Sequence, residues 1–282
     1  MGTLYVVATP IGNLEDISFR AVRILKEAGL IAAEDTRKAL RLLAAYDIHT
    51  PLESYHRHSS GGKLERLLEA LESRDVALIS EAGTPGISDP GQELIREAID
   101  RGFPVVPIPG PSAVITALVA SGLPTDRFLY LGFLPRVRSD RRKLLASVAD
   151  APYTLVAFEA PHRLMAALVD IHELLGNRQA AAARELTKLH EEVVRGRLSD
   201  LREHFETTSP RGEFTLVLAP PDAESAPREV RPPADLGGLA SSLRGQGLSP
   251  KEAVRQMMSQ TGAGRRVAYA AWLAANREAV TE

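Results

Sequence analysis

Three glycine- and proline-rich segments carry the backbone groups best suited to hold a small molecule. They are TPIGNLED at residues 9–16, EAGTPGISDP at residues 81–90 and PGPSA at residues 109–113. Each follows a short apolar run typical of a strand, and ligands of open α/β sheets bind beyond the carboxyl ends of the strands. Amides and carbonyls exposed there suit an uncharged or zwitterionic ligand such as an adenosyl amino acid. By spacing alone, tight turns between strand and helix are the commoner explanation of such loops.

Several other chemistries are excluded or disfavoured by what the chain lacks. It has no cysteine, which rules out a thiolate nucleophile, a disulfide framework and a cysteine-ligated metal. The loops have neither the Walker A spacing nor the G-x-G-x-x-G fingerprint, which disfavours nucleotide hydrolysis and NAD chemistry. The seven histidines do not fall at metal-ligand spacing, so we expect no metal site.

Charged residues where strands end form a second group of candidates. Glu34, Asp35 and Arg37 follow the apolar run 30–33, and Glu81 opens the longest loop. These side chains either orient a ligand or a hydroxyl, or form an acidic helix N-terminus that the helix dipole favours. The sequence leaves both interpretations open.

Basic residues gather in two short runs. The net charge of −2 gives the molecule no overall attraction for nucleic acid, so any RNA contact must come from local patches. Such runs are also commonly solvated faces. The residues are Arg136, Arg138, Arg141, Arg142 and Lys143 in one run, and Arg265 with Arg266 in the other.

The elements that must position these loops follow an α/β pattern. Apolar runs alternate with helical periodicity through residue 219, which predicts a largely parallel sheet. Asp16 is the expected N-cap of the first helix, and Asp89 with Pro90 the expected start of a later one. The clearest elements are strands 4–8, 30–33, 76–79 and 105–106 and a helix over 61–73.

The pattern restarts after Gly122 and Pro124, which predicts a second lobe. We expect lobes over 1–120 and 121–220, a linker over 221–235 and a helical tail over 236–282. Ser249 to Glu252 have the form of a capping box, and Arg265 begins a further helix, giving a helix–turn–helix-like outline. The residues expected to face inward in the tail are Val254, Met257, Met258, Val267 and Trp272.

Nothing in the chain predicts a targeting or membrane segment. The N-terminus lacks a basic region followed by a long apolar one, and no later run approaches the length of a membrane span. We therefore expect a cytoplasmic protein.

Seven ordered motifs resemble those of the bacterial 16S rRNA cytidine 2′-O-methyltransferases of the tetrapyrrole-methylase superfamily. The resemblance spans about residues 3–219, and the tail resembles that family's helix–turn–helix appendage. It implies two α/β lobes with S-adenosylmethionine in the cleft between them, a homodimer, no metal, and 16S rRNA in the small ribosomal subunit as substrate. The first loop, residues 9–13, departs from the G-x-G-P-G-D form of the porphyrin-directed members, which favours the RNA branch. The motifs are TPIGNLED, EDTR, SEAGTPGISDPG, PGPSA, GFLPR, FEAPHR and RELTK.

The resemblance also implies which residues touch the cofactor. They come from the three loops of the first lobe and from the GFLPR and FEAPHR motifs of the second. Carried onto this chain they are Pro10, Gly83, Thr84, Pro85, Ile87, Ser112, Ala113, Phe133, Leu134, Glu159 and Ala160.

Methyl transfer to a ribose hydroxyl asks mainly for alignment, with the oxygen held roughly 3 Å from the methyl carbon. A base, or a cation that stabilises the developing alkoxide, would help. The candidates are Lys188 and the pair Asp35 and Arg37. Alternatively, Lys188 binds a phosphate, and Asp35 and Arg37 form a structural ion pair. We expect the tail and the basic helix near residue 140 to hold the RNA. Two other functions remain open, a methyltransferase acting on a tetrapyrrole carbon and a non-catalytic RNA-binding protein.

Overall fold

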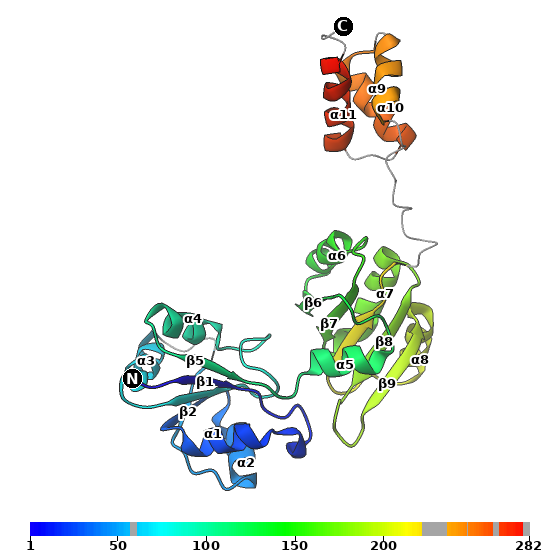
Figure 1. Cartoon of the computed structure of the whole chain (residues 1–282). Helices are drawn as coiled ribbons and strands as arrows, with labels where there is room; N and C mark the ends of the chain where they lie inside the picture. Colours follow the sequence, from blue (N-terminus) through cyan, green and yellow to red (C-terminus); the bar gives the residue numbers. More distant parts are fainter. Residues whose placement is uncertain (57–60, 222–235, 247, 262–264, 279–282) are drawn as a thin grey trace. The chain divides into compact units, whose positions relative to one another are not determined.

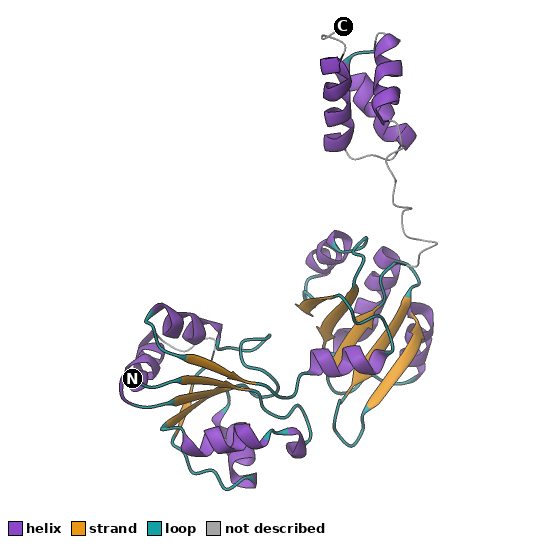
Figure 2. Ribbon diagram, in the orientation of Figure 1, coloured by secondary structure: helices purple, strands orange, loops and turns teal. Residues whose placement is uncertain are grey.

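The computed structural model describes residues 1–56, 61–221, 236–246, 248–261 and 265–278. The chain divides into two compact units, Met1–Pro220 and Pro221–Glu282. The first unit contains two five-stranded sheets with helices on their faces, and the second is helical (Figures 1 and 2). Within the described residues, no helix combines the length and the apolar character needed to cross a bilayer.

The first sheet is entirely parallel, as its alternation with helices predicts. Its order is β3-β2-β4-β1-β5, and β1 pairs with β4 on one side and with β5 on the other. Strands β2 and β4 are buried along their whole length, because helices cover both faces of the sheet. The strands are β1 (Leu4–Val7), β2 (Leu30–Ala33), β3 (Leu52–Ser54), β4 (Val76–Ile79) and β5 (Val105–Ile108).

Alternate residues of each strand face opposite layers. On β4, Ala77 and Ile79 pack with α1 (Phe19–Glu27) and α2 (Thr36–Ala45), while Val76 and Leu78 pack with α3 (Gly61–Ser73) and α4 (Gln92–Asp100). The carboxyl ends of β4, β1 and β5 are therefore adjacent at one edge of the sheet, where the three glycine-rich loops leave it.

The second sheet is mixed, which corrects the expectation of a largely parallel arrangement. Its order is β6-β7-β10-β8-β9; β6 and β7 are parallel and every other pair is antiparallel. The parallel pair β6 and β7 is joined by the crossover helix α6 (Arg138–Ser147), whereas β8 and β9 are joined by a short connection, which permits only antiparallel pairing. The strands are β6 (Phe128–Phe133), β7 (Thr154–Glu159), β8 (Gln179–Arg184), β9 (Glu192–Arg197) and β10 (Phe214–Leu218).

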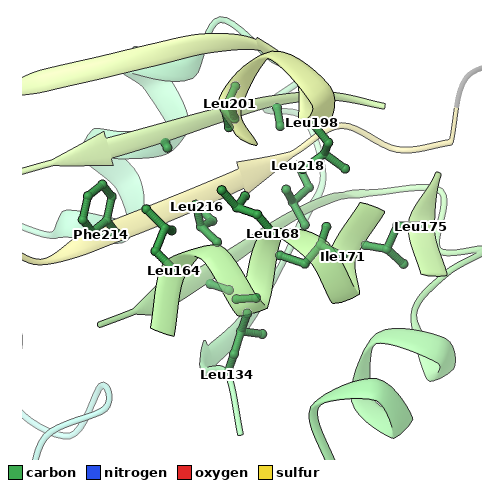
Figure 3. Packing of buried hydrophobic residues seen from close by; sticks show 14 of the residues in the cluster. Leu134, Leu164, Leu168, Ile171, Leu175, Leu198, Leu201, Phe214, Leu216 and Leu218 are labelled. Carbon is green, nitrogen blue, oxygen red and sulfur yellow. The ribbon is translucent and has the colours of Figure 1, made fainter. Parts of the chain in front are cut away.

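The core of this lobe lies between the sheet and the helices α7 (Leu164–Leu175) and α8 (Leu198–Thr207). Figure 3 shows Leu164, Leu168 and Ile171 of α7 against Phe214 and Leu216 of β10, all buried. Each such side chain contributes about 1.5–3 kcal/mol by leaving water. This layer fixes the directions of β7 and β10, whose ends reach the site described below.

Helix α5 (Ala113–Ser121) packs on the second sheet, not on the first. Its buried residues Val114, Ala117 and Leu118 contact Val156 of β7 and Val217 of β10. The expected lobe boundary at residue 120 is therefore wrong, because the chain leaves the first lobe at the PGPS turn, before α5 begins. The sequence assigned α5 to the first lobe because it follows β5 directly. Its apolar face instead packs on the second sheet, whose strands come later in the chain.

Two expected helix starts are also wrong. Asp16 ends the short 3-10 helix η1 (Leu14–Asp16), and α1 is capped instead by Ser18, whose Oγ accepts a hydrogen bond from Ala21 N at 3.1 Å. Helix α4 begins after Gly91 and not at Pro90. Gly91 has a φ of 133°, outside the helical region, so the turn that contains Asp89 and Pro90 ends before the helix starts.

The second unit contains three helices in its described part, one more than the sequence indicated. They are α9 (Leu236–Gly245), α10 (Pro250–Thr261) and α11 (Arg265–Glu278). Helix α9 was missed because Gly237 and Gly238 lower its helix propensity. The capping box is present, with Ser249 N donating to Glu252 Oε2 at 3.1 Å and Glu252 N donating to Ser249 Oγ at 3.4 Å.

The core of the tail confirms part of the expected inward face. Val254, Met257 and Trp272 are buried together. Met258 and Val267 are exposed, so their inward placement is wrong. With the third helix α9 present, Ala240 and Leu243 fill the space that two helices alone would leave to those residues. The turn at Gly262 and Gly264 lies outside the described residues.

Candidate functional site

The three glycine-rich loops converge at the carboxyl edge of the first sheet. Thr9 N donates to Gly83 O at 2.9 Å and Gly83 N donates to Thr9 O at 3.0 Å, which joins the first two loops. The third loop approaches closely as well, since a Cβ atom at Gly110 would lie 3.0 Å from Cβ of Ala8. Glycine is needed at residue 83 for its positive φ of 78° and at residue 110 for this contact.

A cavity that is partly open to solvent lies where these loops meet the second lobe. The expected residues that line it come from both lobes: Gly83, Thr84, Ile87, Ser112, Ala113, Phe133, Glu159 and Lys188.

Six expected residues do not line the cavity. Pro85 and Leu134 are buried behind it, and Pro10 and Ala160 are half-buried next to lining residues in the chain. Asp35 and Arg37 lie on α2, outside the lining. Tertiary structure therefore brings Lys188 to the expected cofactor residues. The EDTR pair is followed by Lys38, which pairs with Glu81 of the lining.

Asp35 is the N-cap of α2. Its Oδ1 accepts hydrogen bonds from Arg37 N at 2.8 Å and from Lys38 N at 3.3 Å. The hydrogen bond from the Arg37 backbone is the main reason why the pKa of Asp35 lies below its usual value. The Arg37 side chain is 92% exposed and its Nε is 3.8 Å from Asp35, so the pair has the helix-terminus role that the sequence left open.

Sequence reasoning named Glu81, which lines the cavity, and missed eleven other lining residues. The EAGTPGISDP and RELTK motifs contain several of them and were a signal, whereas nothing in the sequence marked Glu213, Phe214 or Thr215. These three reach the cavity because β10 pairs with β7 and β8 at its start. The missed residues are Ile11, Ala82, Ser88, Asp89, Val114, Phe158, Glu185, Leu186, Glu213, Phe214 and Thr215.

The lining is acidic. It contains five carboxylates, and Lys188 is the one cationic side chain among the described residues that form it. Glu81 pairs with Lys38, and this hydrogen bond is the main reason why the pKa of Lys38 is raised. The carboxylates are Glu81, Asp89, Glu159, Glu185 and Glu213. Such a cavity favours a positively charged ligand over a phosphate.

Glu159 ends β7 and is 1% exposed. Its Oε1 accepts a hydrogen bond from Ala160 N at 2.8 Å and pairs with Arg163, while its buried Oε2 has no hydrogen-bond partner among the described residues. Burial raises the pKa of Glu159 despite these contacts. A buried acceptor that has no hydrogen-bond partner at a cavity wall is well suited to accept a hydrogen bond from a ligand.

Glu185 and Lys188 form the second charged group of the cavity. Lys188 Nζ lies 3.0 Å from Glu185 Oε1, and Glu213 N donates to the same oxygen at 3.2 Å. Burial opposes ionisation of Glu185, but the hydrogen bonds from Lys188 and Glu213 lower its pKa overall. Glu185 is therefore ionised and holds the Lys188 ammonium at the cavity.

A hydrogen bond joins the long loop to the second lobe. Ser88 Oγ and Tyr130 Oη lie 2.7 Å apart, and Ser88 has a φ of 61°, which is uncommon outside glycine. Burial raises the pKa of Tyr130, whose ring packs edge-on against Phe158 at 5.3 Å. The Ser88 contact thus helps to hold the long loop in its strained conformation.

The basic run on α6 is directed inward, contrary to the RNA-binding face expected there. The side chain of Asp170 is 1% exposed; Arg141 Nη2 lies 2.6 Å from it, and Arg138 Nε and Arg142 Nη1 each lie 3.0 Å from it. Arg141 itself is buried. All three arginines pair with Asp170, but Arg138 remains 65% exposed, so it is an exposed cation of the run together with Arg136 and Lys143.

Residues 3–202 match the family of "Tetrapyrrole (Corrin/Porphyrin) Methylases". The chain is 45% identical to the ribosomal RNA small subunit methyltransferase I of Halalkalibacterium halodurans, covering 95% of this chain and 93% of that protein. It is 46% identical to the protein of the same name from Synechocystis sp., covering 95% and 96%.

Solved structures show the same fold at low sequence identity. A diphthine synthase superposes with a TM-score of 0.61 at 18% identity, covering 77% of this chain and 90% of that one. A cobalt precorrin-4 methyltransferase gives 0.59 at 16% identity, covering 77% and 94%. These likenesses extend over the two α/β lobes.

Proposed function

Because the chain belongs to the tetrapyrrole (corrin/porphyrin) methylase family, we propose that it transfers a methyl group from S-adenosylmethionine to the 2′-oxygen of a cytidine ribose in 16S rRNA of the small ribosomal subunit. The name that its relatives carry supports ribosomal RNA as the substrate. The observation that carries the proposal is the cavity itself, where the loops of the first sheet meet Lys188 and an acidic wall.

The lining fits S-adenosylmethionine better than it fits a nucleotide. The cofactor has a sulfonium and an ammonium, both of which the surrounding carboxylates favour, whereas a phosphate would face repulsion. Ile11, Phe133 and Phe158 offer apolar surface for an adenosyl group, and the N-terminus of α5 suits a carboxylate. The residues proposed to hold the cofactor are Gly83, Thr84, Ile87, Ser112, Ala113, Phe133 and Glu159, with Pro10, Pro85, Leu134 and Ala160 as their chain neighbours.

Lys188 is the residue proposed to act on the substrate oxygen. When bound, the cofactor supplies an electrophilic methyl carbon. The ribose hydroxyl is a weak acid, and the Lys188 ammonium would stabilise the negative charge that develops as the oxygen loses its proton to water. Glu185, kept ionised by its hydrogen bonds, holds that ammonium in place. Asp35 and Arg37 are proposed as the alternative to Lys188, since Lys38, the next residue of α2, pairs with Glu81 of the cavity lining.

We also propose that the protein works in the cytoplasm as a homodimer, with the small ribosomal subunit as its partner and without a metal. Sedimentation of the purified protein tests the dimer. A single species at the mass of one chain, 30.5 kDa, would contradict it.

The decisive assay supplies labelled cofactor to small subunits that lack the modification. We expect one label per subunit and one cytidine position that becomes resistant to alkaline cleavage. Label on uroporphyrinogen but not on subunits would instead favour the tetrapyrrole methyltransferases. Absence of cofactor binding by calorimetry would favour a non-catalytic RNA-binding protein.

A further inference from the structure

The loop after β1 and the turn that carries Lys188 pack against each other without spare room. A Cβ atom at Gly12 would lie 2.5 Å from Lys188 Cγ and 2.8 Å from both Leu186 O and Thr187 Oγ1. Real Cβ atoms essentially never approach another atom within 3.0 Å. Gly12 does not have a positive φ, so this contact, and not its backbone conformation, is what requires glycine.

Hydrogen bonds hold the two segments together. Asn13 N donates to Thr187 Oγ1 at 3.0 Å, and Asn13 Oδ1 accepts from Glu15 N at 3.1 Å to cap η1. The turn is closed by Lys188 N donating to Glu185 O at 3.0 Å. Thr187 has a φ of 66°, which is costly for a β-branched residue, so the turn depends on these contacts for its shape.

Lys188 is thereby restrained at two points. Its Cγ lies against Gly12, and its Nζ lies 3.0 Å from Glu185 Oε1. A free lysine side chain samples many rotamers, and removing the unproductive ones in advance lowers the cost of placing the ammonium. The first lobe thus helps to set the position of a charged group on the second.

We propose that Gly12 is a positioning residue for Lys188: the absence of a side chain at residue 12 lets the lysine stem lie where its ammonium reaches the substrate oxygen. This inference rests on the function proposed above for Lys188. A methyl group at residue 12 would displace the stem, since Leu186 O, 2.8 Å from the same Cβ atom, belongs to the backbone and cannot turn away.

A double-mutant cycle tests this role. The variants are Gly12→Ala, Lys188→Met and the combination, each assayed for ribose methylation and for cofactor affinity. We expect Gly12→Ala to lower kcat by about 10- to 100-fold, because small misplacements of reacting groups cost that much, with a cofactor Kd within about threefold of wild type. In the Lys188→Met background the same change should have no further effect on kcat. An equal reduction in both backgrounds would overturn the proposal.

Gly29→Ala is the matched control. A Cβ atom there would lie 2.8 Å from Arg74 Cβ and 2.9 Å from Arg74 Cδ, so it crowds a cationic stem in the same way but outside the cavity lining. We expect its kcat to stay within about twofold of wild type. A loss as large as that of Gly12→Ala would show that crowding alone, and not the position of Lys188, lowers turnover.

A second measurement does not depend on turnover. The hydrogen bond from Lys188 lowers the pKa of Glu185, so displacement of the lysine in Gly12→Ala should raise that pKa, as its removal in Lys188→Met should. Carbon-13 NMR titration of the Glu185 carboxyl reports this. If the Glu185 carboxyl titrates in Gly12→Ala as it does in the wild type, Gly12 does not position Lys188, whatever reaction the protein catalyses. A raised pKa in a protein that methylates no RNA would instead leave the positioning role standing and reject the proposed function.

Thr187→Val serves if Gly12→Ala does not fold. It removes the acceptor of the Asn13 N–H bond, keeps the branched shape, and should shift the Glu185 titration in the same direction. No shift in that variant would likewise overturn the proposal.

Discussion

Lys188 lines the cavity together with five carboxylates, and its Nζ lies 3.0 Å from Glu185 Oε1. If it stabilises the ribose oxygen, Lys188→Met should lower kcat by about 100-fold, the usual cost of losing one such group. The cofactor Kd should change little, because the carboxylates that favour a positive ligand remain. Single-turnover methylation and calorimetry measure the two effects.

Lys143→Met is the control for this prediction. Its ammonium is 80% exposed, and its nearest acidic partner, Asp140, lies 3.8 Å away. We expect turnover and cofactor affinity to stay at wild-type values. Full activity of Lys188→Met, or an equal loss in Lys143→Met, would contradict the assigned role.

Asp170 is a residue whose importance is structural. Its buried carboxylate accepts hydrogen bonds from Arg138, Arg141 and Arg142, which lower its pKa although burial opposes ionisation. Asp170→Asn would leave Arg141 buried without its counter-charge. We expect a loss of about 3 kcal/mol in the free energy of unfolding at pH 7, measured by urea denaturation.

The pH dependence of this effect follows from the direction of the shift. Because the pKa is lower in the folded state, the stabilisation is complete above the unfolded value of about 3.9 and is lost as the pH falls through the folded value. The difference between wild type and Asp170→Asn should therefore shrink in acid. Asp140→Asn, at an exposed carboxylate on α6, the helix that carries the three arginines, should cost less than about 0.5 kcal/mol. Equal costs for the two variants would refute the buried cluster.

At the scale of elements, α2 depends on the cap that Asp35 provides. Asp35→Ala removes the acceptor for two backbone N–H groups and should cost about 1 kcal/mol of stability. Asp35→Ser keeps a capping oxygen without the charge and should recover most of that loss. Thermal unfolding measures both.

Turnover distinguishes this role from catalysis. If Asp35 acts only as a cap, both variants should methylate RNA within about twofold of wild type at a temperature where both are folded. A loss of activity in Asp35→Ser with stability retained would return Asp35 to the catalytic candidates.

The elements themselves were largely predictable, whereas the partners of α5 were not. Periodicity and glycine or proline signals predicted β1, β2, β4 and β5 because those signals act within a few residues, but they did not predict the three-residue strand β3. The apolar residues of α5 suit either sheet. Its place on the second was decided by contacts with Val156 and Val217, which come later in the chain.

At the scale of the whole molecule, charge is divided unevenly along the chain. Residues 236–282 have six basic and three acidic residues, a net charge of +3, within a chain of net charge −2. Three arginines of α6 form ion pairs with Asp170. We therefore expect the tail, residues 236–282, to supply much of the attraction for RNA phosphates.

Deletion of residues 231–282 should therefore weaken binding to small subunits, by about tenfold at low salt, and leave cofactor affinity unchanged. The remaining unit, Met1–Pro220, is compact by itself. Filter binding at several salt concentrations measures the effect, and the difference from the full chain should narrow as salt rises. RNA affinity that is unchanged at low salt would refute the tail's role.

Residue types and spacing alone determined the loops, the α/β class, the tail and the family resemblance, because turn chemistry and periodicity are local. Only the tertiary structure decided which charges meet. Arg141 and Asp170 lie 29 residues apart, and Asn13 and Thr187 lie 174 apart. Whether a lysine faces a cavity or an arginine is buried depends on such distant contacts, which the packing of two lobes creates and which no short stretch of sequence encodes.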